Sequence, residues 1–215
     1  MMKLYGYWRS TAAYRVRIAL ALKNIAVIDI PVQLVKEGGE QHQQLYRSIN
    51  PQGLVPALDI GGSIITQSMA ILEYLDEQYP EPPLLSEDPV LRAQIRAFCQ
   101  SIVCDIHPLN NLRVLQFLQG SMAVNEEQKM DWYQHWVKTG FEALEAVIDQ
   151  TNRVQPYCFG ELPSMADICL IPQIYNANRF DCAMDNYPNL QRINHNCLQL
   201  EAFESTLPEN QQDAS

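Results

Sequence analysis

The stretch NPQGLVPALDIGGSIITQS at residues 50–68 decides the fold of the N-terminal part of the chain. Two apolar and β-branched runs, 54–60 and 63–66, flank a Gly-Gly dipeptide, a pattern typical of a tight antiparallel hairpin. A helix follows directly, and we expect Ser68 to be its N-cap. The pattern therefore predicts a sheet that ends in two antiparallel strands.

Upstream of the hairpin we expect a strand, a helix and a second strand at 3–8, 11–24 and 27–32. The helix carries apolar side chains at the spacing of one buried face: Ile18, Ala21, Leu22 and Ile25. A strand–helix–strand unit implies parallel strands joined by a right-handed crossover. With a weak short helix at 40–49, the pattern predicts a small α/β domain with a mixed sheet.

A proline-rich segment separates two parts of different character. The prolines of 79–83 cannot continue a helix, and we place a linker there that ends near Asp88. Two domains are therefore expected, an α/β domain at 1–82 and an all-helical domain at 88–215.

The first helix of the second part begins at Asp88-Pro89, an N-cap followed by proline at the first helical position. Its apolar residues recur at steps of three and four as far as Ile106. We expect Pro108 to kink this helix just after His107.

The second part is predicted to be helical almost throughout, with two further helices that can be placed. One carries an apolar stripe between Met130 and Ile148. The next starts at Ser164, and Asp167 stands at capping-box spacing, which predicts a folding role for this carboxylate and not a catalytic one. The polar tail at 209–215 is expected to be mobile.

The composition argues against several classes of function. A net charge of −10 makes nucleic acid an unexpected partner, because both would be negatively charged. No apolar run reaches the ~18 residues of a membrane span, and the first residues do not resemble a signal peptide, so a cytoplasmic location is expected. The six cysteines form no C-x-x-C pair and have no zinc-ligand spacing, so free thiols and no metal are expected: Cys99, Cys104, Cys158, Cys169, Cys182 and Cys197.

Six motifs occur in order along nearly the whole chain. They are YWRSTAAYRVRIALALK (7–23), NPQGLVPAL (50–58), QSMAILEYL (67–75), CDIHPLNNLRVL (104–115), PSMADICLIPQIYNANRF (163–180) and AFESTLPENQQD (202–213). Together they resemble the zeta class of the glutathione transferases. The resemblance implies a thioredoxin-like N-terminal domain, an all-α C-terminal domain, glutathione as cofactor and a homodimer. It also implies cis–trans isomerisation of a dicarboxylate, most closely maleylacetoacetate, with maleylpyruvate as the alternative substrate.

One motif departs from the family pattern. Where the zeta class usually has Ser-Ser-Cys, this chain has Ser10-Thr11-Ala12, so it has no protein thiol at that position. A related bacterial maleylpyruvate isomerase also lacks the cysteine. The departure therefore bears on the identity of the substrate more than on the class of reaction.

The resemblance places a glutathione site on the first domain. Ser10, with Thr11 as the alternative, would donate a hydrogen bond to the thiolate sulfur at a helix N-terminus. Pro56 would follow a cis peptide bond and turn the backbone of Val55 toward the cysteinyl part. Further glutathione contacts are implied at Gln41, Gln67, Ser68, His107 and Asn111. From the residues alone, the two hydroxyls and Ser68 could be helix caps only, and Pro56 a turn proline.

Substrate carboxylates require cations, and the resemblance points to Arg9, Arg113 and Arg179. Arg179 matches the substrate arginine of the family, while a solvated surface position is the ordinary alternative for each. His107 could polarise a substrate oxygen, bind glutathione or simply pack. The two other arginines of the first helix are interpreted as structural: Arg15 and Arg17.

Two other functions use the same fold. A general conjugating or dehalogenating enzyme would need no carboxylate-binding arginines, so the three arginines favour the isomerase. A non-enzymatic binding protein is less consistent with an intact glutathione site.

Overall fold

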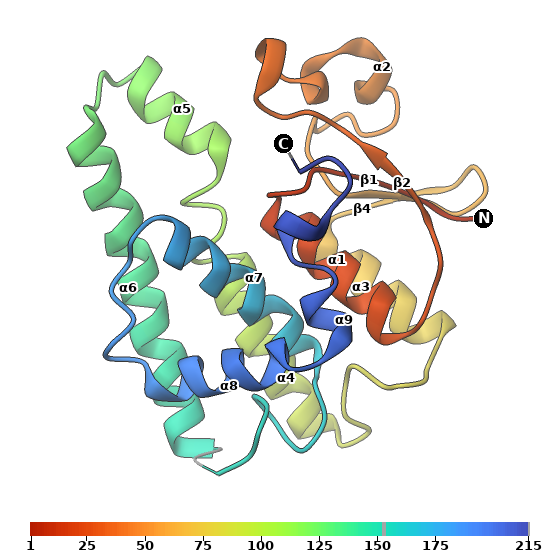
Figure 1. Ribbon diagram of the computed structural model, residues 1–215, viewed down its shortest axis with the longest axis vertical. Coiled ribbons are helices and arrows are strands. Elements are labelled where there is room, and N and C mark those ends of the chain that lie inside the picture. Colours follow the sequence, from red (N-terminus) through yellow and green to blue (C-terminus); the bar gives the residue numbers. More distant parts are fainter. Residues whose placement is uncertain (152–153, 215) are drawn as a thin grey trace. The chain divides into compact units, whose positions relative to one another are not determined.

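The computed structural model describes residues 1–151 and 154–214, and its backbone is shown in Figure 1. It divides the chain into two compact units, residues 1–84 with 199–215, and residues 85–198. The strands are β1 Lys3–Gly6, β2 Ile28–Pro31, β3 Ala57–Asp59 and β4 Ile64–Thr66. The helices of the first unit are α1 Thr11–Leu22, η1 Lys36–Gly38, η2 Glu40–His42, α2 Gln44–Arg47, α3 Ser68–Gln78, α9 Glu201–Glu204 and η3 Pro208–Asn210. Those of the second unit are α4 Pro89–Val103, α5 Leu112–Gly120, α6 Glu126–Thr151, α7 Met165–Arg179 and α8 Pro188–Leu198.

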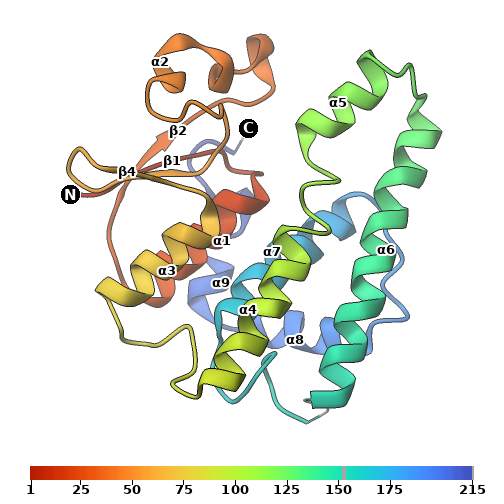
Figure 2. The same ribbon diagram turned by 180° about the vertical axis from the view of Figure 1, so that it is seen from behind.

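The first unit is built on a mixed sheet with the strand order β2-β1-β3-β4. β1 is parallel to β2 and antiparallel to β3, and β3 is antiparallel to β4. Helices α1 and α3 pack side by side, as both views show (Figures 1 and 2). The predicted small α/β domain with a mixed sheet is confirmed.

The Gly-Gly hairpin is also confirmed. Ile60 N–H donates to the carbonyl of Ser63 at 2.9 Å, which closes the turn. Gly61 and Gly62 have φ angles of 83° and 103°, values that a side chain rarely allows. The carboxylate of Asp59 accepts a hydrogen bond from Gly62 N–H at 2.7 Å and fixes the turn further.

Helix α3 begins differently from the prediction. The N-cap is Gln67, in the left-handed region with a φ of 71°, and Ser68 is the first helical residue. The hydroxyl of Ser68 accepts a hydrogen bond from Arg15 at 3.2 Å. The expectation that Ser68 caps the helix is therefore wrong, because the hydroxyl is engaged by a buried guanidinium.

Within its described residues, the second unit is built of helices, with one isolated β-bridge between Tyr157 and Gly160. Helix α4 has the predicted cap, since the Asp88 carboxylate accepts from Leu91 N–H at 2.7 Å. It does not continue to a kink at Pro108 but ends at Val103, and turns follow before α5. Pro108 has no N–H with which to continue the helical ladder, and its ring disfavours helical backbone in the residue before it. The chain therefore stops the helix instead of bending it.

The end of the chain packs against the first unit, although the sequence assigned it to the helical domain. Helix α9 packs on α1, and the hydroxyl of Tyr14 donates to the carbonyl of Phe203 at 3.5 Å. The tail at 209–215 is predicted to be mobile, yet Trp8 N–H donates to the carboxylate of Asp213 at 3.0 Å; Ser215 lies outside the described residues. Long-range contacts of this kind have no local sequence pattern.

None of the described helices is both long and apolar enough to cross a membrane.

Helix α7 begins with the predicted capping box. Asp167 is fully buried, and one carboxylate oxygen accepts from Cys158 N–H at 2.8 Å. The other accepts from the N–H and the hydroxyl of Ser164, at 2.8 and 2.9 Å. Burial raises the pKa of this carboxyl, and the hydrogen bonds from Ser164 and Cys158 oppose the rise. The geometry supports a folding role.

Replacing Asp167 by alanine should destabilise the protein strongly, because three buried donors lose their acceptor at ~1 kcal/mol or more each. We expect a loss of about 3 kcal/mol in urea unfolding. Asp131→Ala, which removes an exposed carboxylate from α6, is the matched control and should change stability by less than ~0.5 kcal/mol. Equal stability of the two variants would contradict the assigned role.

Candidate active site

The turn between β1 and α1 places Ser10 at the N-terminus of a buried helix. Ser10 is the N-cap, and its Oγ accepts from Ala13 N–H at 3.2 Å. Its carbonyl accepts from Tyr14 N–H at 2.8 Å. Because the hydroxyl acts as an acceptor in the cap, its proton can still be donated to a ligand. The amide groups and dipole of the helix N-terminus favour a negative charge there.

The neighbouring hydroxyl is less accessible. Thr11 is buried as the first residue of α1, whereas Ser10 is only half-buried. Of the two predicted hydroxyls, Ser10 is therefore the better placed to reach a ligand.

Arg9 is held by two aromatic side chains of the same turn. Its guanidinium lies 4.5 Å from the centre of the Trp8 ring, and its Nη2 donates to the hydroxyl of Tyr7 at 3.4 Å. Such contacts orient a guanidinium without neutralising it. The turn therefore presents a hydroxyl and a positive charge on adjacent residues.

The N-terminus of α3 forms a second polar region of the first unit. The side-chain amide of Gln67 donates to Gln52 Oε1 at 2.8 Å. Ser68 is buried, and the guanidinium that binds it, Arg15, is only 1% exposed. A helix N-terminus whose first residue is hydrogen-bonded to a buried arginine favours a carboxylate ligand, because the helix dipole and the guanidinium are both positive there.

The peptide bond between Val55 and Pro56 is cis, as the resemblance implied. Pro56 is buried directly before β3, and Val55 is half-buried.

Gln41, a predicted glutathione contact, is largely buried between η1 and α2. Its side chain is 5% exposed, and Nε2 donates to the carbonyl of Leu34 at 3.1 Å. A Cβ on Gly39 would lie 2.4 Å from the Gln41 amide, so the loop closes tightly around this side chain. Its Oε1 is buried without a hydrogen-bond partner among the residues described. In this structure Gln41 holds the loop between η1 and η2.

Three predicted residues lie on one segment of the helical unit. His107 is half-buried among the turns after α4, and its backbone N–H donates to the carbonyl of Ile102 at 2.9 Å. Asn111 is the N-cap of α5, since its Oδ1 accepts from Arg113 N–H at 3.2 Å. Arg113 itself is exposed in the first turn of that helix.

Arg179 is the last residue of α7 and is exposed. Its Nη1 donates to Asn176 Oδ1 at 3.0 Å, and its guanidinium lies 4.7 Å from the centre of the Phe180 ring. These two contacts restrict the orientation of the guanidinium.

Three side chains form contacts with predicted site residues that were not predicted from the sequence. Asn176 stands three residues before Arg179 on a helix, a spacing that could have indicated the contact. Gln52 lies within the motif at 50–58, but its bond to Gln67 joins the two ends of the β3–β4 hairpin, 15 residues apart. Arg15 was interpreted as structural, and its bond to Ser68 had no local signal.

Four of the six cysteine thiols are buried, whereas Cys182 is half-buried and Cys104 is exposed. Cys158, Cys169 and Cys197 are fully buried, and burial raises the pKa of the Cys158 and Cys197 thiols. Burial also raises the pKa of the half-buried Cys182 thiol to about 11. Within 1–151 and 154–214, no group of three or more His, Cys, Asp or Glu side chains could hold a metal ion.

Comparison with known proteins identifies the family. The glutathione S-transferase N-terminal domain family matches residues 4–83. A probable maleylacetoacetate isomerase of Vibrio cholerae is 48% identical over 98% of this chain and 97% of its own length. The chain therefore belongs to the glutathione transferase family.

Its relatives within that family include isomerases of two names. A maleylpyruvate isomerase of a Ralstonia species is 40% identical over the full length of both chains. The solved holo structure of a maleylpyruvate isomerase, described as a bacterial zeta-class glutathione transferase, has a TM-score of 0.96 at 39% identity and covers 99% of this chain and 100% of its own. A maleylacetoacetate isomerase structure from Methylobacterium extorquens, with bound malonate and glutathione, has a TM-score of 0.94 at 39% identity and covers 99% of both chains.

Proposed function

We propose that this protein is a glutathione-dependent cis–trans isomerase that converts maleylacetoacetate to its trans isomer. The observation that carries the proposal is the half-buried Ser10 hydroxyl at the N-terminus of α1, in a chain 48% identical to a probable maleylacetoacetate isomerase. Relatives from Pseudomonas aeruginosa and mouse, at 46% and 44% identity, carry the same name.

The residues of the first unit fit glutathione. Ser10 can donate to a sulfur, and the N-terminus of α1 stabilises negative charge on it. Gln67 and Ser68 at the N-terminus of α3 suit the γ-glutamyl carboxylate, and the buried charge of Arg15 adds to that preference. The backbone of Val55 before the cis proline would pair with the cysteinyl part. The bound glutathione in the Methylobacterium relative supports this assignment.

Bound glutathione would supply a thiolate that adds reversibly to the cis double bond and so makes it a rotatable single bond. Ser10 stabilises the thiolate by its hydrogen bond. Arg9, Arg113 and Arg179 hold the substrate carboxylates. His107 donates a hydrogen bond to the oxygen on which negative charge develops, and Asn111 and Gln41 remain proposed glutathione contacts.

The Ser10 hydroxyl can be separated from its helix cap by a pair of variants. Ser10→Gly removes the hydroxyl but leaves an acceptable N-cap, whereas Ser10→Ala removes both, at ~1 kcal/mol of stability. Both should lose on the order of a hundredfold in kcat/KM for glutathione-dependent isomerisation.

Steady-state kinetics and thermal unfolding on the same preparations distinguish the two roles. Ser10→Gly with wild-type kcat/KM would mean that the residue acts only as a helix cap. Thr11→Ala is the neighbouring control and should retain most activity, since its hydroxyl is buried.

Arg179 is proposed to bind a substrate carboxylate. It is exposed, oriented by Asn176 and Phe180, and placed at the end of α7.

The wild-type protein should isomerise maleylacetoacetate only when glutathione is present. Arg179→Ala should lose ~2–5 kcal/mol of transition-state binding, seen as a fall in kcat/KM. Arg179→Lys should recover only part, because a point charge cannot form two parallel hydrogen bonds.

Two controls accompany the Arg179 variants. Arg92→Ala, on α4, should behave as the wild type. Conjugation of an uncharged electrophile to glutathione should survive Arg179→Ala. An equal loss of both activities would show that Arg179 is structural, and absence of wild-type isomerisation would overturn the proposed function.

Maleylpyruvate is the second candidate substrate. The solved maleylpyruvate isomerase structure, with a TM-score of 0.96 to this chain, supports it. The same assay with both substrates, compared by kcat/KM, decides between them.

A homodimer in the cytoplasm is the proposed working form. The proposal rests on the resemblance to the zeta class, which implies a homodimer, and on the prevalence of two-fold dimers among soluble oligomers. Light scattering at micromolar concentration should give a mass near twice 24.6 kDa. A mass near 24.6 kDa would refute the dimer.

A further inference from the structure

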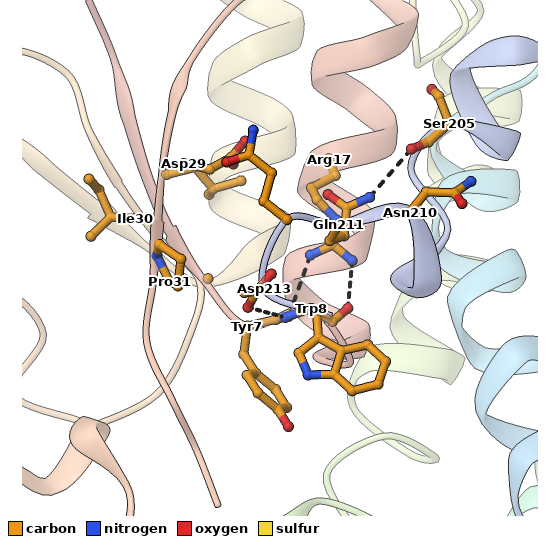
Figure 3. Close-up of a pocket in the computed structure, with 13 residues that line it drawn as sticks. Tyr7, Trp8, Arg17, Asp29, Ile30, Pro31, Ser205, Asn210, Gln211 and Asp213 are labelled. Atoms are coloured by element: carbon orange, nitrogen blue, oxygen red, sulfur yellow. Dashed lines mark hydrogen bonds between the residues drawn. The ribbon is translucent and has the colours of Figure 1, made fainter. Parts of the chain in front are cut away.

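Two charged side chains form hydrogen bonds with the backbone of the turn that carries Ser10. Arg17 donates from Nη2 to the carbonyl of Trp8 at 2.8 Å and from Nη1 to the carbonyl of Tyr7 at 3.4 Å. Asp213 accepts from Trp8 N–H at 3.0 Å. Figure 3 shows the guanidinium and the carboxylate on the same side of the turn. Both backbone polar groups of Trp8 are therefore bonded to charged side chains, and such bonds are the stronger kind.

The C-terminal segment that carries Asp213, residues 204–214, is stabilised by hydrogen bonds of its own. The side-chain amide of Gln211 donates to the carbonyl of Leu207 at 2.9 Å, and that of Asn210 donates to the carbonyl of Glu204 at 2.8 Å. Ala214 N–H donates to the carbonyl of Gln211 at 3.0 Å. These bonds fix the backbone on both sides of Asp213, so its carboxylate reaches the turn from a defined position.

A small cavity of about 180 Å³ lies between the strands, the turn and this segment (Figure 3). Its lining includes Arg17, Asp29 and Asp213, so two carboxylates face one guanidinium. Burial raises the pKa of Asp29, and the nearby Arg17 charge opposes the rise. Arg17 is thus placed among acidic groups that stabilise its charge at this location.

The bonds to Tyr7 and Trp8 are made next to the proposed sulfur-binding residue. Ser10 N–H also donates to the carbonyl of Tyr7, at 2.9 Å. A shift of the Trp8 peptide would therefore move the carbonyl that anchors Ser10 and, with it, the hydroxyl of the N-cap.

We propose that Asp213 is a positioning residue for Ser10: by fixing the peptide between Tyr7 and Trp8, it holds the Ser10 hydroxyl at the sulfur of bound glutathione. The proposal rests on the proposed function and extends it to the far end of the chain. Asp213 does not touch the ligand and acts through the backbone of the turn.

Three variants test the proposal. Asp213→Ala leaves Trp8 N–H without its acceptor and should lower kcat on the order of tenfold, because small displacements of a reacting group are costly. It should also raise the pKa of the bound glutathione thiol, followed by thiolate absorbance against pH. Asp213→Asn keeps an oxygen acceptor and should restore most of both properties. Gln212→Ala removes the neighbouring side chain of the same cavity and should match the wild type.

The outcomes separate this proposal from the proposed function. If the wild type binds glutathione and isomerises substrate while Asp213→Ala keeps the same kcat and thiol pKa, the positioning role is wrong and the function stands. If Asp213→Asn is as impaired as Asp213→Ala, the acceptor oxygen is not the cause and the role is again wrong. If isomerisation by the wild type does not depend on glutathione, both the positioning role and the proposed function are wrong.

Discussion

The burial of two arginines in one helix is the constraint on which the first unit depends. Arg15 and Arg17 lie on α1, which is buried along nearly its whole length. A buried guanidinium without hydrogen-bond partners would cost several kcal/mol, so its partners must be kept in place. Arg15 donates to Ser68 at the start of α3, and Arg17 donates to the carbonyls of the turn before α1. Folding the core therefore also sets the two helix N-termini at which glutathione is proposed to bind.

This arrangement explains how an acidic chain can bind an anionic ligand. The net charge is −10, so long-range attraction does not favour glutathione or a dicarboxylate. Local fields replace it: the N-termini of α1 and α3, the guanidinium beneath Ser68, and Arg9 over the Trp8 ring. Such short-range interactions act within a few ångströms and are little affected by the overall charge.

Local patterns predicted the features that depend on neighbouring residues. The Gly-Gly hairpin, the Asp88 cap and the capping box of Asp167 were correct because each is decided within a few residues. The positive φ of Gln67 has no local signal, since a bond between distant side chains fixes the start of α3. The contact of Asp213 with Trp8 has none either, because it joins residues 205 positions apart. For the candidate site, the resemblance pointed to the Ser10 turn, while only the structure showed that Gln41 is buried.

The pKa of the thiol of bound glutathione tests the central claim most directly. Thiolate absorbance is measured against pH in the complex of wild-type protein with glutathione and compared with free glutathione, whose thiol resembles that of free cysteine at ~8.5. The account predicts a bound thiol that titrates at least one pH unit lower, because the N-terminus of α1 and the Ser10 hydroxyl both favour the thiolate. A bound thiol that titrates at or above the value of free glutathione would contradict it.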